Sequence, residues 1–261
     1  MSYNTPKQIV EIVSDVANVK ARTSVSKTLI LAFLAGAYIA IGGLLAVIIG
    51  GGVPGIAAEN PGISKFLMGA AFPIGLILCT LAGADLFTGN TAYFIPPVMN
   101  RKLSVLDMLR NWGLVYAGNF IGALFVAYFL VTLTGIIAKD PWLSSVYAIA
   151  DAKTTAPFYK VFLKGIGANW LVALAMWQAY AAKDVTSKIL GIWFPVMAFV
   201  AIGFEHSIAN MFFIPAAIFN GAAVSWPDFI IHNLIPATLG NIVGGSVLVG
   251  FLYWMVYGKE K

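Results

Sequence analysis

Long stretches without charged residues constrain this chain more than any other feature. Asp, Glu, Lys and Arg are absent from residues 28–58, 66–84, 111–138, 165–182, 189–204, 207–227 and 229–257. A helix that crosses a bilayer needs about 20 apolar residues. The whole chain is 60% hydrophobic and 10% charged, which excludes an ordinary soluble domain. We therefore predict an integral membrane protein.

The windows predict six crossing helices in an all-α fold, with both chain ends on one side of the membrane. The expected bounds are about 28–50, 66–99, 106–137, 158–181, 188–220 and 228–257. Polar motifs interrupt the second and the fifth of these helices. With this topology, 11 of the 16 Lys and Arg residues fall on the side of the termini. Because cytoplasmic loops carry the excess of positive charge, we predict cytoplasmic N- and C-termini.

Residues 1–26 are too polar for a signal peptide and predict an amphipathic helix instead. Apolar side chains recur there at helical spacing, at Ile9, Ile12, Val13, Val16 and Val19. Such a helix either lies along the inner membrane surface or packs on its own bundle or a neighbouring subunit. The net charge of +5 follows from the positive-inside bias and requires no nucleic-acid partner.

The two interrupted helices are related by an internal duplication. Residues 83–90 read GADLFTGN and residues 203–210 read GFEHSIAN, an offset of 120. A second pair of motifs, in the third and sixth helices, matches at an offset of 122: Asn111-x6-Gly118-Asn119 and Asn233-x6-Gly240-Asn241. Each half, 27–137 and 153–257, then holds three crossings. Because three is odd, the halves must lie in opposite orientations, so we predict an inverted 3+3 repeat in one transmembrane domain spanning 1–261.

The ionisable side chains expected at membrane depth are Asp85, Glu205 and His206, and all three lie in the duplicated motifs. Such groups are costly in a bilayer and usually face a bundle interior or an aqueous path. An interrupted helix also exposes backbone N–H and C=O groups that lipid cannot satisfy. We predict that Asp85 and Glu205, together with Asn90 and Asn210, support the breaks by capping these groups rather than by contacting substrate.

His206 and Thr88 are the stronger candidates for chemistry along a path. Histidine can hold or release a proton near neutral pH, and Thr88 offers a hydroxyl beside the flexible Gly89. A membrane-embedded metalloenzyme is the alternative from another class. His206, Glu205 and the distant Asp85 fall short of a three-ligand zinc set, and the one cysteine, Cys79, excludes a Cys-based metal site, so we predict neither a metal, a cofactor nor catalysis.

Three segments resemble the formate/nitrite transporter family: GADLFTGNT (83–91), GFEHSIANMF (203–212) and NLIPATLGNIVGG (233–245). The resemblance implies an aquaporin-like fold, a homopentamer with one pore per protomer, and a place in the inner membrane of a bacterium. It also implies passage of small monovalent weak-acid anions. Formate is favoured, because GAD resembles the formate channels; nitrite or hydrosulfide is the alternative, and acetate and lactate are further candidates.

The same resemblance implies roles for single residues. His206 corresponds to the central pore histidine, and Thr88 to the threonine of the loop that interrupts the second helix. Asn169 corresponds to a pore-lining asparagine and Lys153 to a vestibule lysine that attracts anions. The constrictions correspond to Leu76 with Phe72 on the cytoplasmic side and to Phe199 on the periplasmic side. Because a hydrophobic ring opposes a hydrated charge, we expect the anion to cross as the neutral acid or to exchange its water for hydrogen bonds. We expect transport to be pH-gated or coupled to protons through His206, which can relay a proton to the substrate, and to strengthen as pH falls.

Overall fold

The computed structural model describes residues 3–259, and this part of the chain is helical almost throughout. Lys261, which was counted among the predicted cytoplasmic charges, lies outside the described residues. The first half contains α1 Pro6–Arg22, α2 Val25–Gly50, α3 Pro54–Glu59, α4 Pro61–Ala71, α5 Ile74–Leu81, α6 Phe87–Tyr93, α7 Ile95–Met99 and α8 Val105–Phe125, with the π-helical η1 Val126–Thr132. The second contains α9 Trp142–Thr154, α10 Phe158–Ala181, α11 Val185–Ile202, α12 Ser207–Phe219, η2 Asp228–Leu234, α13 Ile235–Gly245, η3 Ser246–Phe251 and η4 Trp254–Gly258.

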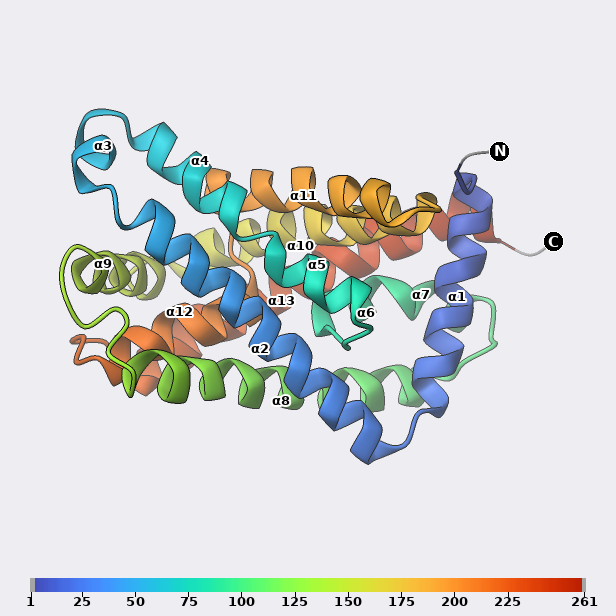
Figure 1. Cartoon of the computed structure of the whole chain (residues 1–261). Helices are drawn as coiled ribbons and strands as arrows, with labels where there is room; N and C mark the ends of the chain where they lie inside the picture. The colour runs from blue at the N-terminus through green and yellow to red at the C-terminus, as the bar shows by residue number, and fades with distance from the viewer. Residues whose placement is uncertain (1–2, 260–261) are drawn as a thin grey trace.

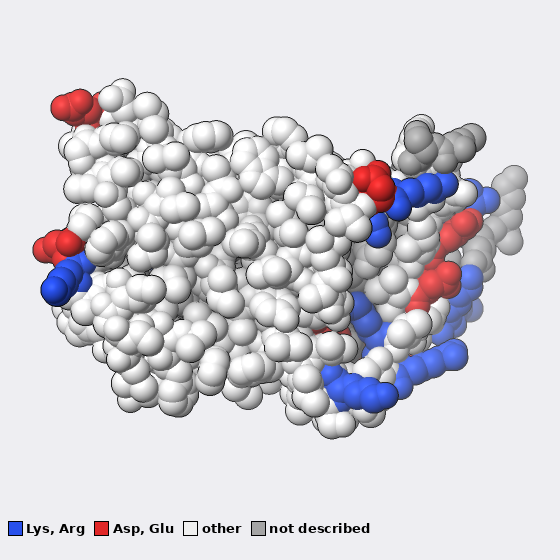
Figure 2. Space-filling model, in the orientation of Figure 1, with Lys and Arg blue, Asp and Glu red and all other residues white. Residues whose placement is uncertain are grey.

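The helices form an elongated bundle (Figure 1). The long helices run along the bundle, α1 lies across one end, and α3 and α9 lie at the other; we refer to these as the α1 end and the α9 end. Both chain termini are at the α1 end. On the face shown in Figure 2, the charged side chains gather at the two ends and leave the middle of the bundle bare. This distribution suits a protein whose middle lies in hydrocarbon.

Within the described residues, five helical segments are long and apolar enough to cross a membrane: 25–50, 61–81, 105–132, 185–202 and 228–258. The fourth predicted helix, α10, has 24 residues but is not among them, because polar residues such as Asn169 and Gln178 lower its hydropathy. The third helix stops at Thr132 rather than at the predicted residue 137. The chain turns there through Gly135, whose φ of 68° is left-handed. Two short helices, α3 and α9, were not predicted.

Both interrupted helices break at the predicted motifs. The chain leaves α5 through Gly83 at φ 78° and leaves α11 through Gly203 at φ 87°. Glycine adopts this left-handed conformation without steric cost, whereas other residues resist it. The chain then runs extended for a few residues before α6 and α12 begin at Phe87 and Ser207. The first interrupted helix also has a joint at Phe72 and Pro73, between α4 and α5.

The amphipathic helix α1 packs on its own bundle, which was one of the alternatives for residues 1–26. A capping box between Thr5 and Gln8 begins it. Its apolar face is buried at Ile9, Val10, Val13 and Ala17, and it contacts α6, α7, α8, α10 and η4.

Glycines allow close backbone contact in two matching helix pairs, α2 with α8 and α10 with α13. A Cβ atom at Gly122 of α8 would lie 2.0 Å from the Phe33 carbonyl oxygen of α2. At the matching position of the second half, a Cβ at Gly244 of α13 would lie 2.3 Å from the Ile166 carbonyl oxygen of α10. No larger residue fits at either place, so these glycines let the backbones touch.

Candidate functional site

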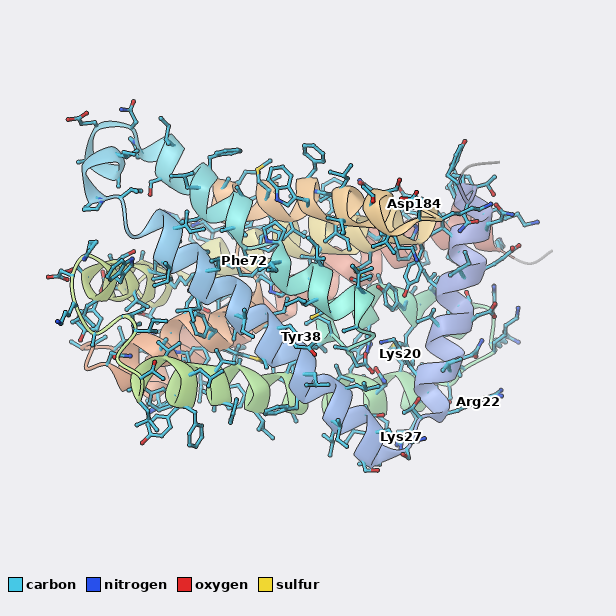
Figure 3. All side chains as sticks on the ribbon, in the orientation of Figure 1. Lys20, Arg22, Lys27, Tyr38, Phe72 and Asp184 are labelled. Carbon is cyan, nitrogen blue, oxygen red and sulfur yellow. The ribbon has the colours of Figure 1, made fainter. Side chains whose placement is uncertain are left out.

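The first break is held by a cluster of polar side chains around Asp85. Lys20 of α1, which is labelled in Figure 3, forms an ion pair with the Asp85 carboxylate. The Asn90 amide donates to Asp85 Oδ1 at 2.7 Å and to Asn111 Oδ1 at 2.8 Å. Asp85 and Asn90 are both buried. The carboxylate is therefore compensated by a cation and a hydrogen-bond donor, which a buried charge requires.

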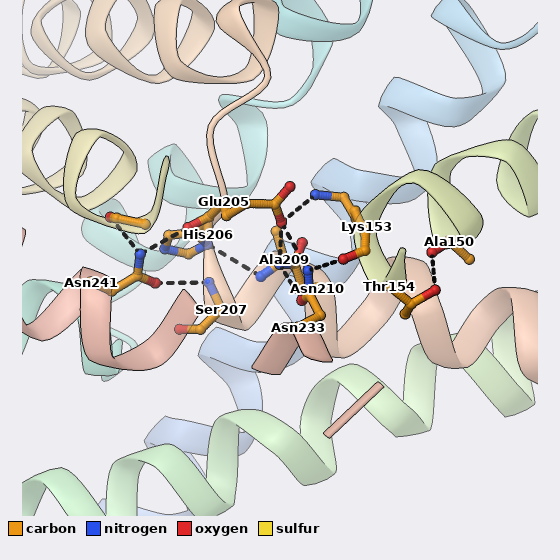
Figure 4. Close-up of polar contacts among 11 residues, drawn as sticks. Ala150, Lys153, Thr154, Glu205, His206, Ser207, Ala209, Asn210, Asn233 and Asn241 are labelled. Carbon is orange, nitrogen blue, oxygen red and sulfur yellow. Dashed lines mark hydrogen bonds and ion pairs between the residues drawn. The ribbon is translucent and has the colours of Figure 1, made fainter. Parts of the chain in front are cut away.

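The second break repeats this cluster around Glu205, as Figure 4 shows. Lys153 Nζ of α9 lies 2.9 Å from Glu205 Oε2. The Asn210 amide donates to Glu205 Oε2 at 2.7 Å and to Asn233 Oδ1 at 2.7 Å. Lys153 was predicted to be a vestibule cation that attracts anions. The structure gives its charge a carboxylate partner, and this compensates the buried Glu205.

The helix ends at the breaks are capped by residues other than those predicted. Asn119 Oδ1 accepts from the Phe87 backbone N–H at 3.0 Å, and its amide donates to the carbonyl oxygens of Ala32 and Asp85. Asn241 does the same for the second break. Its Oδ1 accepts from Ser207 N–H at 2.8 Å, while its amide donates to the carbonyls of Gly165 and Glu205.

The prediction that Asp85, Asn90, Glu205 and Asn210 cap the exposed backbone is thus wrong in its contacts. Asp85 and Glu205 each lie one residue before the N-cap residue, Leu86 or His206, and their carboxylates pair with lysines. An asparagine on a neighbouring helix reaches those amides instead. The four predicted residues still lie at the breaks, where they form the two ion-pair clusters.

The two halves therefore repeat in their contacts as well as in their motifs. The backbone N–H of Asp85 donates to Leu31 O, and the backbone N–H of Glu205 donates to Lys164 O. Lys20 in the first cluster is matched by Lys153 in the second. The N-terminal helix α1 and the loop helix α9 thus each supply the lysine that pairs with the acid of one break.

Thr88 and His206 meet between the two breaks. His206 Nε2 lies 2.9 Å from Thr88 Oγ1, and both side chains are buried. His206 also precedes α12, where its Nδ1 accepts from the Ala209 backbone N–H at 3.2 Å. Because Nδ1 accepts this bond, it carries no proton. The neutral ring then has its proton on Nε2 and donates to Thr88.

Asn169 of α10 ties this pair to both halves of the protein. Its amide nitrogen donates to Thr88 O at 3.2 Å, to Thr91 Oγ1 at 2.8 Å and to Asn241 O at 2.6 Å. Its Oδ1 is buried and has no hydrogen-bond partner. The structure thus brings Thr88, Asn169 and His206 together.

An apolar constriction adjoins this pair. It closes around a space too small for a water molecule and is lined by Ile39, Phe72, Leu76, Leu86, Val172, Val196, Phe199 and His206. The ring of Phe72 contacts that of Phe199, with centroids 5.8 Å apart, and it stacks on Phe213. Phe72 was predicted to join Leu76 on the opposite side from Phe199. It belongs with Phe199, since it contacts that ring and, unlike Leu76, does not line the cavity at the α1 end.

A cavity of about 500 Å³ reaches the other side of the constriction, at the α1 end. It lies between α1, α5, α6 and α10, and Leu76 and Leu86 line both it and the constriction. Leu86 is the first-half counterpart of His206, since each residue directly follows the acid of its motif. The two leucines therefore separate the cavity from the Thr88 and His206 pair.

Sequence analysis missed Lys20, Leu86, Asn119 and Asn241 as members of the site. Leu86 could have been found by aligning the two motifs, which places it opposite His206. Lys20 follows the buried Ala17 with the spacing Ala-x2-Lys, as Lys153 follows Ala150. That signal is short and did not distinguish Lys20 from other surface lysines.

Comparisons with known proteins bear on the whole chain. Residues 7–255 match the family model described as formate/nitrite transporter. A probable formate transporter of Methanothermobacter thermautotrophicus is 44% identical over 99% of both chains. The formate channel BtFdhC of Bacillus thuringiensis is 41% identical over 100% of this chain and 98% of its own. The solved structure of a pentameric formate channel with formate bound is 35% identical, covers 90% of this chain and 98% of its own, and superposes with a TM-score of 0.78.

Proposed function

Because the chain belongs to the formate/nitrite transporter family, we propose that it carries formate across a membrane, through a path in each subunit of a homopentamer. Its relatives are transporters and channels rather than enzymes. Three of them are named as formate transporters or channels, and one of these, a solved structure, is a pentamer. In the proposed topology six helices cross the membrane as inverted halves of three. The α1 end then faces the cytoplasm of a bacterial cell, since it carries most of the basic residues.

The observation that carries this proposal is the pairing of Thr88 with His206 beside the constriction. Two hydrogen-bonding side chains, 2.9 Å apart and fully buried, lie where Phe72 and Phe199 on one side and Leu76 and Leu86 on the other exclude water. An anion that leaves its hydration shell at such a place needs replacement hydrogen-bond donors. The Thr88 hydroxyl and the His206 Nε2–H supply them.

The apolar rings favour a neutral substrate over a charged one. Formate that has taken up a proton crosses as formic acid, which lacks the large desolvation penalty of an ion. Transport of this kind delivers one proton with each formate and becomes faster as pH falls. The proton need not reside on His206. The Ala209 N–H already occupies Nδ1, so charging the ring would break the cap of α12.

In this proposal, the two Lys–acid clusters lie at the two ends of the path. Each lysine has three N–H donors, and its carboxylate partner does not consume all of them. An approaching anion can accept a remaining donor while the buried carboxylate stays compensated. Lys20 and Lys153 then bind incoming anions at the two ends of the path. Neither lysine is an isolated buried charge, because each keeps its carboxylate partner.

Formate flux into proteoliposomes tests the proposal. We expect the wild-type protein to carry 13C-formate faster at pH 5.5 than at pH 7.5. His206→Leu, which copies the Leu86 of the other half, removes the central donor and should abolish most of the flux. Thr88→Val should weaken it by removing one hydroxyl. If His206→Ala carries formate with unchanged rate and unchanged pH dependence, the proposed role of His206 is wrong.

Nitrite and hydrosulfide are the competing substrates, because each is a small monovalent weak-acid anion. The inhibition of 13C-formate flux by unlabelled formate, nitrite, hydrosulfide, acetate or lactate, measured at both pH values, ranks these anions as substrates. Formate should be the best competitor. A protein that carries nitrite or hydrosulfide well and formate poorly would overturn the assignment of formate while leaving the path itself intact.

A further inference from the structure

The cavity at the α1 end contains polar groups that the matched end of the protein lacks. Tyr93 of α6 and Tyr180 of α10 both line it. By the offset of 120, Phe213 corresponds to Tyr93. The matched backbone bonds to Leu31 O and Lys164 O relate α2 to α10 at an offset of 133, so Val47 corresponds to Tyr180. The two clusters are otherwise alike. Lys20 Nζ lies 5.9 Å from the ring centroid of Tyr93, and Lys153 Nζ lies 5.9 Å from that of Phe213. The hydroxyls are thus the feature that distinguishes the α1 end.

The two tyrosines lie against each other and present hydroxyl donors to the cavity. Their rings meet edge to face, with centroids 5.6 Å apart, and both residues line the cavity. Each hydroxyl carries one hydrogen that it can donate. Within residues 3–259, no protein acceptor for either hydroxyl is found beyond the neighbouring tyrosine. Even if one hydroxyl donates to the other, one O–H is left to donate to whatever fills the cavity.

Gly89 keeps the Tyr93 hydroxyl accessible. A Cβ atom at Gly89 would lie 3.3 Å from the hydroxyl oxygen, so any larger residue would crowd it. Gly89 also lines the cavity, directly after Thr88. The hydroxyl pair therefore lies next to the break whose threonine contacts His206.

The charges around the cavity favour a small anion as its occupant. Lys20 has three N–H donors, and Asp85 accepts from it. Asp85 is compensated by Lys20 and Asn90, so its charge does not repel an anion strongly. The other acid of the cavity, Asp15, is exposed, and solvent screens it. At about 30 Å³ for each water, a cavity of about 500 Å³ has room for an anion with much of its hydration shell.

We propose that the Tyr93–Tyr180 hydroxyl pair and Lys20 form a carboxylate-binding site at the α1 end, where formate exchanges its first waters for protein donors before reaching the constriction. One carboxylate oxygen accepts from the free tyrosine O–H and the other from Lys20. Because the α9 half has Phe213 and Val47 in these places, formate binds more tightly from the α1 end than from the α9 end. This inference rests on the proposed transport of formate.

Formate uptake measured from each face separately tests it. Proteoliposomes with a single protein orientation, established by protease access to the C-terminus, give the half-saturating formate concentration at either face. The wild-type value should be lower at the α1 end. In the double variant Tyr93→Phe/Tyr180→Phe, that value should rise roughly 2- to 10-fold, the effect of one lost neutral hydrogen bond. The value at the α9 end should stay the same.

Tyr253→Phe is the matched control, because Tyr253 packs on Trp177 but does not line the cavity. It should leave both faces unchanged. The inference is overturned if the double variant binds formate as the wild type does, or if both faces weaken equally. Failure of the proposed function looks different, because the wild-type protein would then carry no formate from either face.

Discussion

Replacing Asn241 by alanine should destabilise the protein strongly, because this one side chain satisfies three backbone groups at the second break. It accepts from the Ser207 N–H at 2.8 Å and donates to the carbonyls of Gly165 and Glu205, each also at 2.8 Å. Asn241 is fully buried, so water cannot replace it. Hydrogen bonds between membrane helices average about 0.6 kcal/mol, and three of them sum to about 2 kcal/mol.

The cost of leaving the groups unpaired raises this figure. A buried donor or acceptor without a partner costs about 1–3 kcal/mol, so three of them set an upper bound of about 9 kcal/mol. We expect a loss of at least about 2 kcal/mol in the free energy of unfolding. This is a large part of the 5–15 kcal/mol typical of a folded protein.

The first half supplies the matched variant. Asn119 makes the same three kinds of contact, to Phe87 N at 3.0 Å, Ala32 O at 2.7 Å and Asp85 O at 2.9 Å. Asn119→Ala should therefore lose about as much stability as Asn241→Ala, while the exposed Asn60→Ala should lose almost none. Unfolding by SDS in mixed micelles, followed by circular dichroism, measures all three. A loss below about 1 kcal/mol for Asn241→Ala, or a value for Asn119→Ala that resembles the surface control, would refute the reasoning.

Three further variants test separate parts of the structure. Lys153→Met should lower the free energy of unfolding by about 3–5 kcal/mol, because it leaves the Glu205 carboxylate buried without its cation. The double variant Lys153→Met/Glu205→Gln should recover most of that loss in the same unfolding assay. If it recovers none, loss of the ion pair is not the cause. Gly122→Ala would place a methyl group 2.0 Å from a backbone oxygen of α2, so its thermal midpoint in detergent should fall by several degrees, whereas an unchanged midpoint would show that the helices separate freely. The pKa of Asp184 is lowered by hydrogen bonds from the Ser187 backbone N–H and hydroxyl. A carboxyl with a lowered pKa stabilises the protein above its unfolded pKa of about 3.9 and loses this effect as pH falls through its folded pKa. The thermal midpoint of Asp184→Ala should therefore differ most from the wild type near neutral pH, and the difference should shrink in acid; a difference that stays constant with pH would contradict this.

The membrane class, the two breaks and their relation to each other could all be predicted from the sequence. Their signals are local, because a charge-free window or a Gly-x-Asp motif is written in consecutive residues. The repeat could be recognised for the same reason, since GADLFTGN and GFEHSIAN align without gaps. The glycines at 83 and 203 mark the breaks because few other residues adopt their left-handed backbone.

The partners of those motifs were decided by tertiary structure alone. Lys20 reaches Asp85 across 65 residues, and Asn119 reaches Phe87 across 32. Nothing in the local pattern marks either residue, because a lysine on an amphipathic helix and an asparagine in a membrane helix have many uses. Phe72 was assigned to the wrong side for a similar reason. Its side chain direction depends on the joint at Pro73 and on where α11 packs.

The sequence by itself thus determined where the membrane helices break and which residue types lie there. Folding decided which side chain caps a helix, which one forms an ion pair and which one contacts the other half. Asn241 caps α12, Glu205 turns to Lys153, and His206 is left to meet Thr88. The physical reason is that every buried polar group in a membrane protein must find a partner inside the protein. Which partner it finds depends on how distant helices pack, and that information is spread over the whole chain.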